Sequence, residues 1–236
     1  MQQRMAVALA GTCILAAGCS PNSNQAIPTT STSSTTAPPV AAAALDGLLL
    51  SAAEINTAMG ATQVSVTVDT KQMEDVSAVV ARSECLPIYS PAEAAAYAGS
   101  GWTAVHRQDL SDPSHAAVQS VVLFPSARQA AAFFTASAKS WQACANQSFT
   151  HIMSGGHEVW EVGPISNTNG ILSTVAQISL EIDHLPATPE GAGLTGRRVL
   201  TVRNNVIIDI FTDSPNANDP AAVEIAAQIA AKVPSK

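Results

Sequence analysis

Four cysteines offer the best-defined chemistry in the chain: Cys13, Cys19, Cys85 and Cys144. Cys85 and Cys144 form an even pair within the part of the sequence that has a globular composition, which predicts a disulfide in an oxidising compartment. In the chain-entropy model, closing a loop of about 60 residues stabilises a fold by about 4 kcal/mol. The alternative is two free thiols. Without a C-x-x-C pair or a neighbouring histidine cluster, neither a metal site nor a thioredoxin-like redox site is predicted.

Cys19 has a different context, because it ends an N-terminal export signal. Arg4 is the only charged residue among residues 1–18, and it precedes an uncharged run that is too short to span a bilayer comfortably. Residues 15–19 (LAAGC) resemble a bacterial lipobox, with Ala16 where leucine is usual. This pattern predicts a lipoprotein signal peptide over residues 1–18, lost together with Cys13, and a diacylated Cys19. The alternative is an ordinary secretory signal with an incidental cysteine.

Residues 19–44 are expected to be a tether between the lipid and the folded domain. Residues 20–44 carry no charge and include the run TTSTSSTT at 29–36, a composition too polar to form a core. A flexible coil of this length spans roughly 25 to 30 Å. Acyl chains on Cys19 would hold the protein stably on the extracytoplasmic face of the cell membrane. Whether the tether carries O-linked sugars stays open.

A search for catalytic residues finds no recognisable set. The sequence has no H-E-x-x-H, G-x-S-x-G or S-x-x-K motif, no P-loop and no dinucleotide fingerprint. The histidines are predicted to be solvated or structural; they are His106, His115, His151, His157 and His184. We therefore expect no enzyme activity, no cofactor and no metal, and the residues that bind a ligand stay unknown.

Asp209 stands out because it interrupts the apolar run VIIDI at residues 206–210. A carboxylate there could be an acid with a perturbed pKa. The simpler interpretation, which we favour, places it on the solvent face of an edge strand.

Composition and charge exclude other classes of protein. The chain of 236 residues is 47% hydrophobic and 12% charged, which is typical of an ordered globular protein. With a net charge of −7, the chain lacks the excess of basic residues that is typical of a nucleic-acid binder. We expect a single folded domain over residues 45–236, and a monomer.

Helix signals alternate with strand signals along this domain. A capping box at Ser51 predicts a helix over residues 52–59, and a second box at Ser90 predicts one from Pro91 to near Gly99. Ser126 is expected to cap a helix over residues 127–145, and a last helix is expected over residues 220–233. The predicted strands are residues 62–68, 102–110, 116–124, 157–162, 174–182, 197–202 and 206–211. Short turns between successive strands favour an antiparallel sheet flanked by amphipathic helices, an α+β fold.

Four segments, in this order and spacing, resemble the PknH-like extracellular domain found in mycobacteria. They are LDGLLL at residues 45–50; PAEAAAY at 91–97 followed by Gly101 and Trp102; FPSA at 124–127 leading to WQAC at 141–144; and NVIIDI at 205–210 before a helix ending in IAAKV at 229–233. This family occurs on a receptor serine/threonine kinase and, alone, on lipoproteins.

The resemblance implies an antiparallel sheet flanked by helices, with a cleft for an unidentified ligand and no catalytic residues. Family members commonly have a second disulfide in the C-terminal half, but this chain has no cysteine after Cys144. Its C-terminal strands are therefore expected to be less constrained.

Two functions are compatible with these observations. The first is a sensor-like binding module that holds a small molecule or a cell-wall fragment. The second is an interaction module that docks on another envelope protein. A deep apolar cleft with a few polar groups would favour the first, and a flat apolar patch would favour the second.

Overall fold

The computed structural model describes residues 37–183, 193–216 and 219–234. The predicted signal peptide, Cys19 and tether residues up to 36 lie outside the described residues, as does His184. Residues 37–44, predicted as the end of the tether, belong to the folded unit. Val40 is buried, and its backbone exchanges hydrogen bonds of 2.7 and 3.1 Å with the side chain of Asn205.

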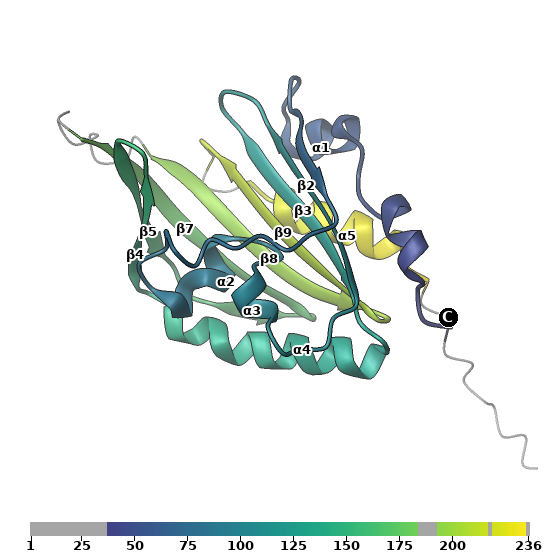
Figure 1. Ribbon diagram of the computed structural model, residues 1–236. Helices are drawn as coiled ribbons and strands as arrows, with labels where there is room; N and C mark the ends of the chain where they lie inside the picture. The colour runs from purple at the N-terminus through teal and green to yellow at the C-terminus, as the bar shows by residue number, and fades with distance from the viewer. Residues whose placement is uncertain (1–36, 184–192, 217–218, 235–236) are drawn as a thin grey trace, which may run out of the picture. The chain divides into compact units, whose positions relative to one another are not determined.

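The centre of the fold is an antiparallel sheet (Figure 1). In the described residues its strand order is β1-β2-β3-β9-β8-β7-β5-β4, with the short β6 paired to β7. The strands are β1 Ser65–Thr70, β2 Ala104–Ser111, β3 Ala116–Leu123, β4 Ser148–Met153, β5 Gly156–Val162, β6 Ser166–Thr168, β7 Ile171–Ile182, β8 Leu194–Arg203 and β9 Val206–Ser214.

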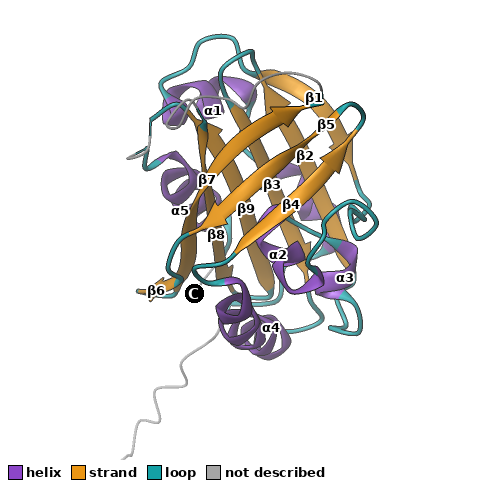
Figure 2. Cartoon of the chain, turned by 90° about the vertical axis from the view of Figure 1, so that its left-hand side faces the viewer, coloured by secondary structure: helices purple, strands orange, loops and turns teal. Residues whose placement is uncertain are grey.

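The sheet is strongly twisted, so that its β7-β5-β4 end crosses in front of the remaining strands (Figure 2). Trp160 of β5 thereby contacts Phe211 of β9, with ring centroids 5.5 Å apart, although two strands separate β5 from β9 in the sheet. Long strands of L-residues twist because of their backbone preferences. The sheet thus encloses part of its own inner face.

Helices cover both faces, and each face has its own core. On the outer face lie η1 (Ala42–Gly47), α1 (Ala52–Met59) and α5 (Ala221–Lys232). On the inner face lie η2 (Ser83–Cys85), α2 (Leu86–Tyr89), α3 (Ala94–Tyr97), α4 (Ala127–Ser140) and η3 (Trp141–Cys144). The side-chain alternation of a strand explains the two cores: on β9, Ile208 and Ile210 join the outer core, whereas Ile207 and Phe211 join the inner one.

The two layers and the antiparallel sheet confirm the predicted α+β class. Helix α1 has the predicted bounds and both hydrogen bonds of the capping box at Ser51, and Gly60 ends it with a φ of 64°. Ser126 caps α4 as predicted. That helix stops at Ser140, and the remaining predicted residues form the 3-10 turn η3.

The second predicted capping box is wrong. Ser90 is not a helix N-cap but the residue that ends α2. Its hydroxyl instead donates to Glu74 at 2.6 Å, and Glu93 caps the four-residue α3. A tertiary contact has therefore replaced the local one.

Three strand predictions need correction. The strand predicted over residues 62–68 is β1, Ser65–Thr70. It is an edge strand with a register shift between Val66 and Val68, and both valines are over 40% exposed. Strands β4 and β6 were not predicted at all. β6 (SNT) has no apolar residue and β4 (SFTHIM) does not alternate regularly, and both are defined by their pairing with β7 and β5.

Candidate functional site

The inner face contains a cavity of about 480 Å³ between the sheet and the helices α2, α3 and α4. This volume is in the usual range for small-molecule sites. The lining residues are Ser83, Glu84, Leu86, Pro87, Ser90, Ala95, Ala96, Tyr97, Phe133, Ser137, Ser140, Trp141, Ala143, Arg198, Leu200 and Asp209. They come from three separate stretches of the chain, residues 83–97, 133–143 and 198–209.

Aromatic and aliphatic side chains make most of the cavity wall. Tyr97 stacks on Phe133 with ring centroids 4.3 Å apart, and Phe133 also contacts Phe124. Trp141, directly after α4, also lines the cavity and is 1% exposed. Phe133 faces the inner core because residues three and four apart on α4 lie on one side of the helix, here with Ala130 and Ser137. The cavity is therefore a predominantly apolar site with pre-formed walls.

An ion pair lies at its floor. Nη1 of Arg198 on β8 is 2.5 Å from Oδ1 of Asp209 on β9, and both side chains are 2% exposed. The guanidinium lies over the ring of Trp141 at 5.4 Å from its centroid, a cation–π arrangement. Within the described ranges, Glu84 is the only other charged residue that lines the cavity.

The expectation for Asp209 is thus wrong: it lies neither at an edge nor in solvent. Strand β9 is central, paired with β3 and β8, and Asp209 faces inward beneath α3. Its Oδ2 accepts hydrogen bonds from the backbone N–H of Ala92 and from the hydroxyl of Tyr97, each at 2.9 Å. Burial, together with the adjacent Asp209 carboxylate, raises the pKa of Tyr97 well above its ordinary value, so this hydroxyl remains a donor.

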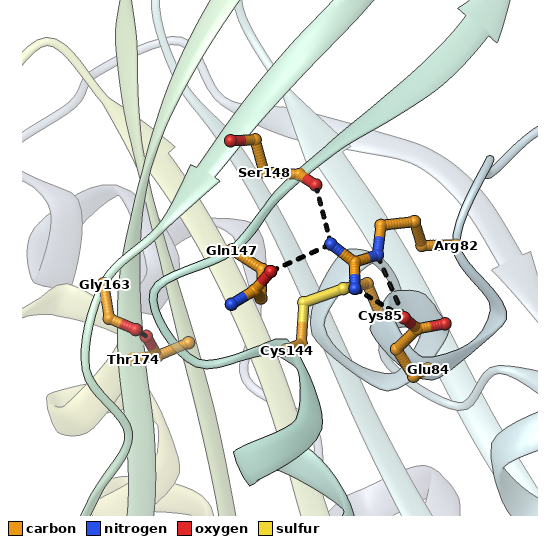
Figure 3. The surroundings of a disulfide bond; sticks show 8 residues. All are labelled: Arg82, Glu84, Cys85, Cys144, Gln147, Ser148, Gly163 and Thr174. Carbon is orange, nitrogen blue, oxygen red and sulfur yellow. Dashed lines mark hydrogen bonds and ion pairs between the residues drawn. A yellow bond between two sulfur atoms is a disulfide. The ribbon is translucent and has the colours of Figure 1, made fainter.

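The predicted disulfide joins Cys85 and Cys144, whose Cα atoms are 5.2 Å apart and whose side chains are fully buried. It links η2 to η3, and the residues beside each cysteine line the cavity. Figure 3 shows Arg82 next to the bond, with its guanidinium donating to Glu84 at 2.7 and 2.9 Å and to Gln147 at 3.1 Å. The disulfide thereby fastens two walls of the cavity to each other.

The described histidines lie away from the cavity and are paired with carboxylates. The imidazole of His106 is buried between Asp69 and Asp46 at 2.8 and 3.2 Å. His151 contacts Glu158 and the Tyr89 hydroxyl, and the remaining two described histidines pair with Asp112 and Glu181. Within the described ranges, no group of three or more His, Cys, Asp or Glu side chains could hold a metal ion.

A half-buried carboxylate lies further along β9. Oδ1 of Asp213 accepts a hydrogen bond from the backbone N–H of Ala116 at 2.7 Å. Desolvation is the main reason that the pKa of Asp213 is raised from 3.8 to about 6, and the charge of Glu158 adds to it. This residue is not among those that line the cavity.

Sequence reasoning predicted none of the lining residues as part of a binding site; it predicted Cys85 and Cys144, which fasten the walls without lining the cavity. The one available signal was Asp209 itself, a charge within an apolar strand. Its partner, Arg198, lies in the neighbouring strand, two residues before the position paired with Asp209. Without knowledge of the strand order, this diagonal relationship cannot be recognised.

In the part of the chain that the structure describes, no helix is both long and apolar enough to cross a bilayer. The antiparallel sheet and the inner-face cavity define an α+β domain with a candidate binding site. The model of the family described as the PknH-like extracellular domain matches residues 40–232. The chain belongs to this family.

Individual relatives agree with this assignment. Two serine/threonine-protein kinases named PknH, from Mycobacterium bovis and Mycobacterium tuberculosis, are each 30% identical to this chain over 197 residues, or 81% of it. The chain spans only about 30% of the length of these curated relatives. The crystal structure of the extracellular domain of PknH from Mycobacterium tuberculosis superposes with a TM-score of 0.73 at 28% identity, covering 83% of this chain and 97% of that one.

Proposed function

We propose that this domain is a non-catalytic binding module of the cell envelope, which holds a small molecule in the inner-face cavity. The predicted diacylated Cys19 would tether it to the membrane on the extracytoplasmic side. Membership in a family of extracellular domains supports this location, and so does the disulfide, because such bonds persist in oxidising compartments.

The observation that carries the proposal is the cavity itself. A volume of about 480 Å³ whose lining includes Leu86, Phe133 and Trp141 offers mainly apolar surface to a bound molecule. A ligand that covers this surface gains about 25 cal/mol for each Å² removed from water. The walls belong to helices that the disulfide and the sheet hold in place. The entropic cost of ordering the site on binding is therefore small.

The residues around the cavity argue against catalysis. They include hydroxyls, among them Ser137 and Ser140, but no histidine that could act as their base. The Asp209 carboxylate is occupied by Arg198, Ala92 and Tyr97. Among the residues that the structure describes, no nucleophile with an adjacent base faces the cavity.

Native mass spectrometry of the purified full chain tests the proposal. We expect a small molecule that stays bound in the native spectrum and is released on denaturation. The variant Ala96→Leu fills part of the cavity and should lose this molecule. Ala131→Leu makes the same change on the exposed face of α4 and should retain it. Equal occupancy in both variants, or none in the parent protein, would remove the support for this function.

A docking role is the second candidate. The edge strand β1 exposes Val66 and Val68 beside its free backbone edge, and a partner strand could pair there. Changing both valines to lysine should then abolish binding to an envelope protein without affecting the occupancy of the cavity. We rank this function second because two exposed valines make a small docking surface, whereas the cavity has the volume of a small-molecule site.

A further inference from the structure

The charges around the cavity determine which chemical class of ligand it suits. A buried arginine beside a cavity usually suggests an anionic ligand, since its planar fork binds carboxylates and phosphates. The hydrogen bonds of Arg198 lead to the opposite conclusion. We infer that the cavity binds an uncharged, largely apolar molecule, an inference that rests on the proposed binding function.

The protein itself uses the terminal donors of Arg198. Nη1 donates to Asp209 at 2.5 Å and to the carbonyl of Ile210 at 2.8 Å. Nη2 donates to the carbonyls of Pro87 and Ser90 at 3.0 and 3.1 Å. A guanidinium has four terminal N–H groups, so these four bonds occupy all of them. The remaining donor, Nε, is buried and has no partner in the described residues.

Asp209 is equally occupied, because one oxygen accepts from Arg198 and the other from the backbone of Ala92 and the hydroxyl of Tyr97. The pair therefore carries no net charge and fixes β8 and β9 to the segment between α2 and α3. Without breaking one of these bonds, an anionic ligand could reach only the buried Nε of Arg198. Because Asp209 already balances the Arg198 charge, the anion would still be buried without a counter-ion of its own, which is costly. A cationic ligand meets the same obstacle, because Asp209 has no free oxygen.

The rim disfavours an anion as well. Glu84 lines the cavity beside the disulfide, and hydrogen bonds from its own backbone and from Arg82 lower its pKa. It is therefore ionised at neutral pH. The other polar groups at the rim are the neutral hydroxyls of Ser83, Ser137 and Ser140. These can hydrogen-bond a hydroxyl, an ester or an amide of a ligand whose apolar part fills the interior.

Two probes of equal chain length separate the alternatives: decan-1-ol and decanoate, each titrated calorimetrically into the full chain at neutral pH. We expect decan-1-ol to bind about tenfold or more tightly than decanoate, because only the anion must be buried without a partner. Ala96→Leu should weaken both, which assigns the binding to this cavity, and Ala131→Leu should weaken neither.

A charge variant at the rim adds a second measurement. Glu84→Gln should raise the affinity for decanoate about twofold to threefold, a partly screened effect, and leave that for decan-1-ol unchanged. Glu224→Gln removes the same charge from an exposed position of α5 on the outer face and should change neither.

The outcomes distinguish the inference from the proposed function. If decanoate binds as tightly as decan-1-ol or more tightly, and Ala96→Leu blocks it, the cavity is a binding site but the inferred ligand class is overturned. If neither probe binds, or if Ala96→Leu leaves the binding of decan-1-ol intact, both the ligand class and the cavity as its site are overturned.

Discussion

Arg198 and Asp209 meet diagonally across β8 and β9, with 2.5 Å between Nη1 and Oδ1 and almost no exposure of either side chain. In the sheet register, Arg198 is paired with Phe211 and Asp209 with Leu200. The two charges thus lie on the same face of the sheet, and this pair links the sheet to the helical layer above it.

Removing one member of this pair should be strongly destabilising. Asp209→Asn keeps an acceptor for Tyr97 and Ala92 but leaves the Arg198 charge buried and unpaired. Losses of about 3 to 5 kcal/mol are usual for such changes, and urea denaturation would measure them. Asp183→Asn alters an exposed aspartate and should cost less than about 0.5 kcal/mol. A loss at Asp209 no larger than at Asp183 would show that the pair does not stabilise the fold.

The disulfide should contribute to stability and to the shape of the cavity together. The double variant Cys85→Ala, Cys144→Ala is expected to lose about 2 to 5 kcal/mol of unfolding free energy, with η2 and η3 loosening first. Urea denaturation of the parent protein with and without a reductant provides the comparison. Thiol titration of unfolded, non-reduced protein should detect neither Cys85 nor Cys144. Detection of both thiols would contradict the bond.

Membrane attachment should depend on Cys19. Cys19→Ala is expected to move the protein from the membrane pellet to the soluble fraction, because the acyl chains are its only predicted anchor. Cys13→Ala, within the same predicted signal peptide, is the matched control and should leave the protein in the pellet. Fractionation of cells followed by detection of the protein gives the result. If Cys19→Ala still pellets, the lipoprotein interpretation fails or another anchor exists.

Asp213 should make stability depend on pH. Its pKa is raised to about 6 in the folded protein from 3.8, so the folded state holds this proton more tightly than the unfolded state does. The associated stability is fully present below pH 3.8 and is lost as the pH rises to about 6, at most about 3 kcal/mol. Asp213→Asn should remove this dependence, whereas Asp183→Asn should retain it. Urea midpoints between pH 3.5 and 7 measure both, and parallel curves for the parent protein and Asp213→Asn would contradict the shift.

The sequence alone determined the features that depend on neighbouring residues. The capping box at Ser51 and the cap at Ser126 predicted two helix starts correctly, because the bonds involved connect residues three apart. The strands predicted over residues 197–202 and 206–211 pair as the β8–β9 hairpin, whose short turn contains Asn204 with a φ of 51°. The disulfide was predicted from the number of cysteines in the folded domain. The antiparallel α+β class was predicted from successive strands joined by short turns.

Only the tertiary structure decided the features that depend on which strands are neighbours. Ser90 and Glu93 have the spacing of a capping box in sequence. In the structure the Ser90 hydroxyl instead donates to Glu74 and accepts from Arg107. Asp209 lies in a central strand because β3 and β8 flank it, and its partner Tyr97 is 112 residues away in sequence. The cavity exists because the twisted sheet and three helices meet without filling the space between them. No local pattern encodes such a space, since its walls come from segments that only folding brings together.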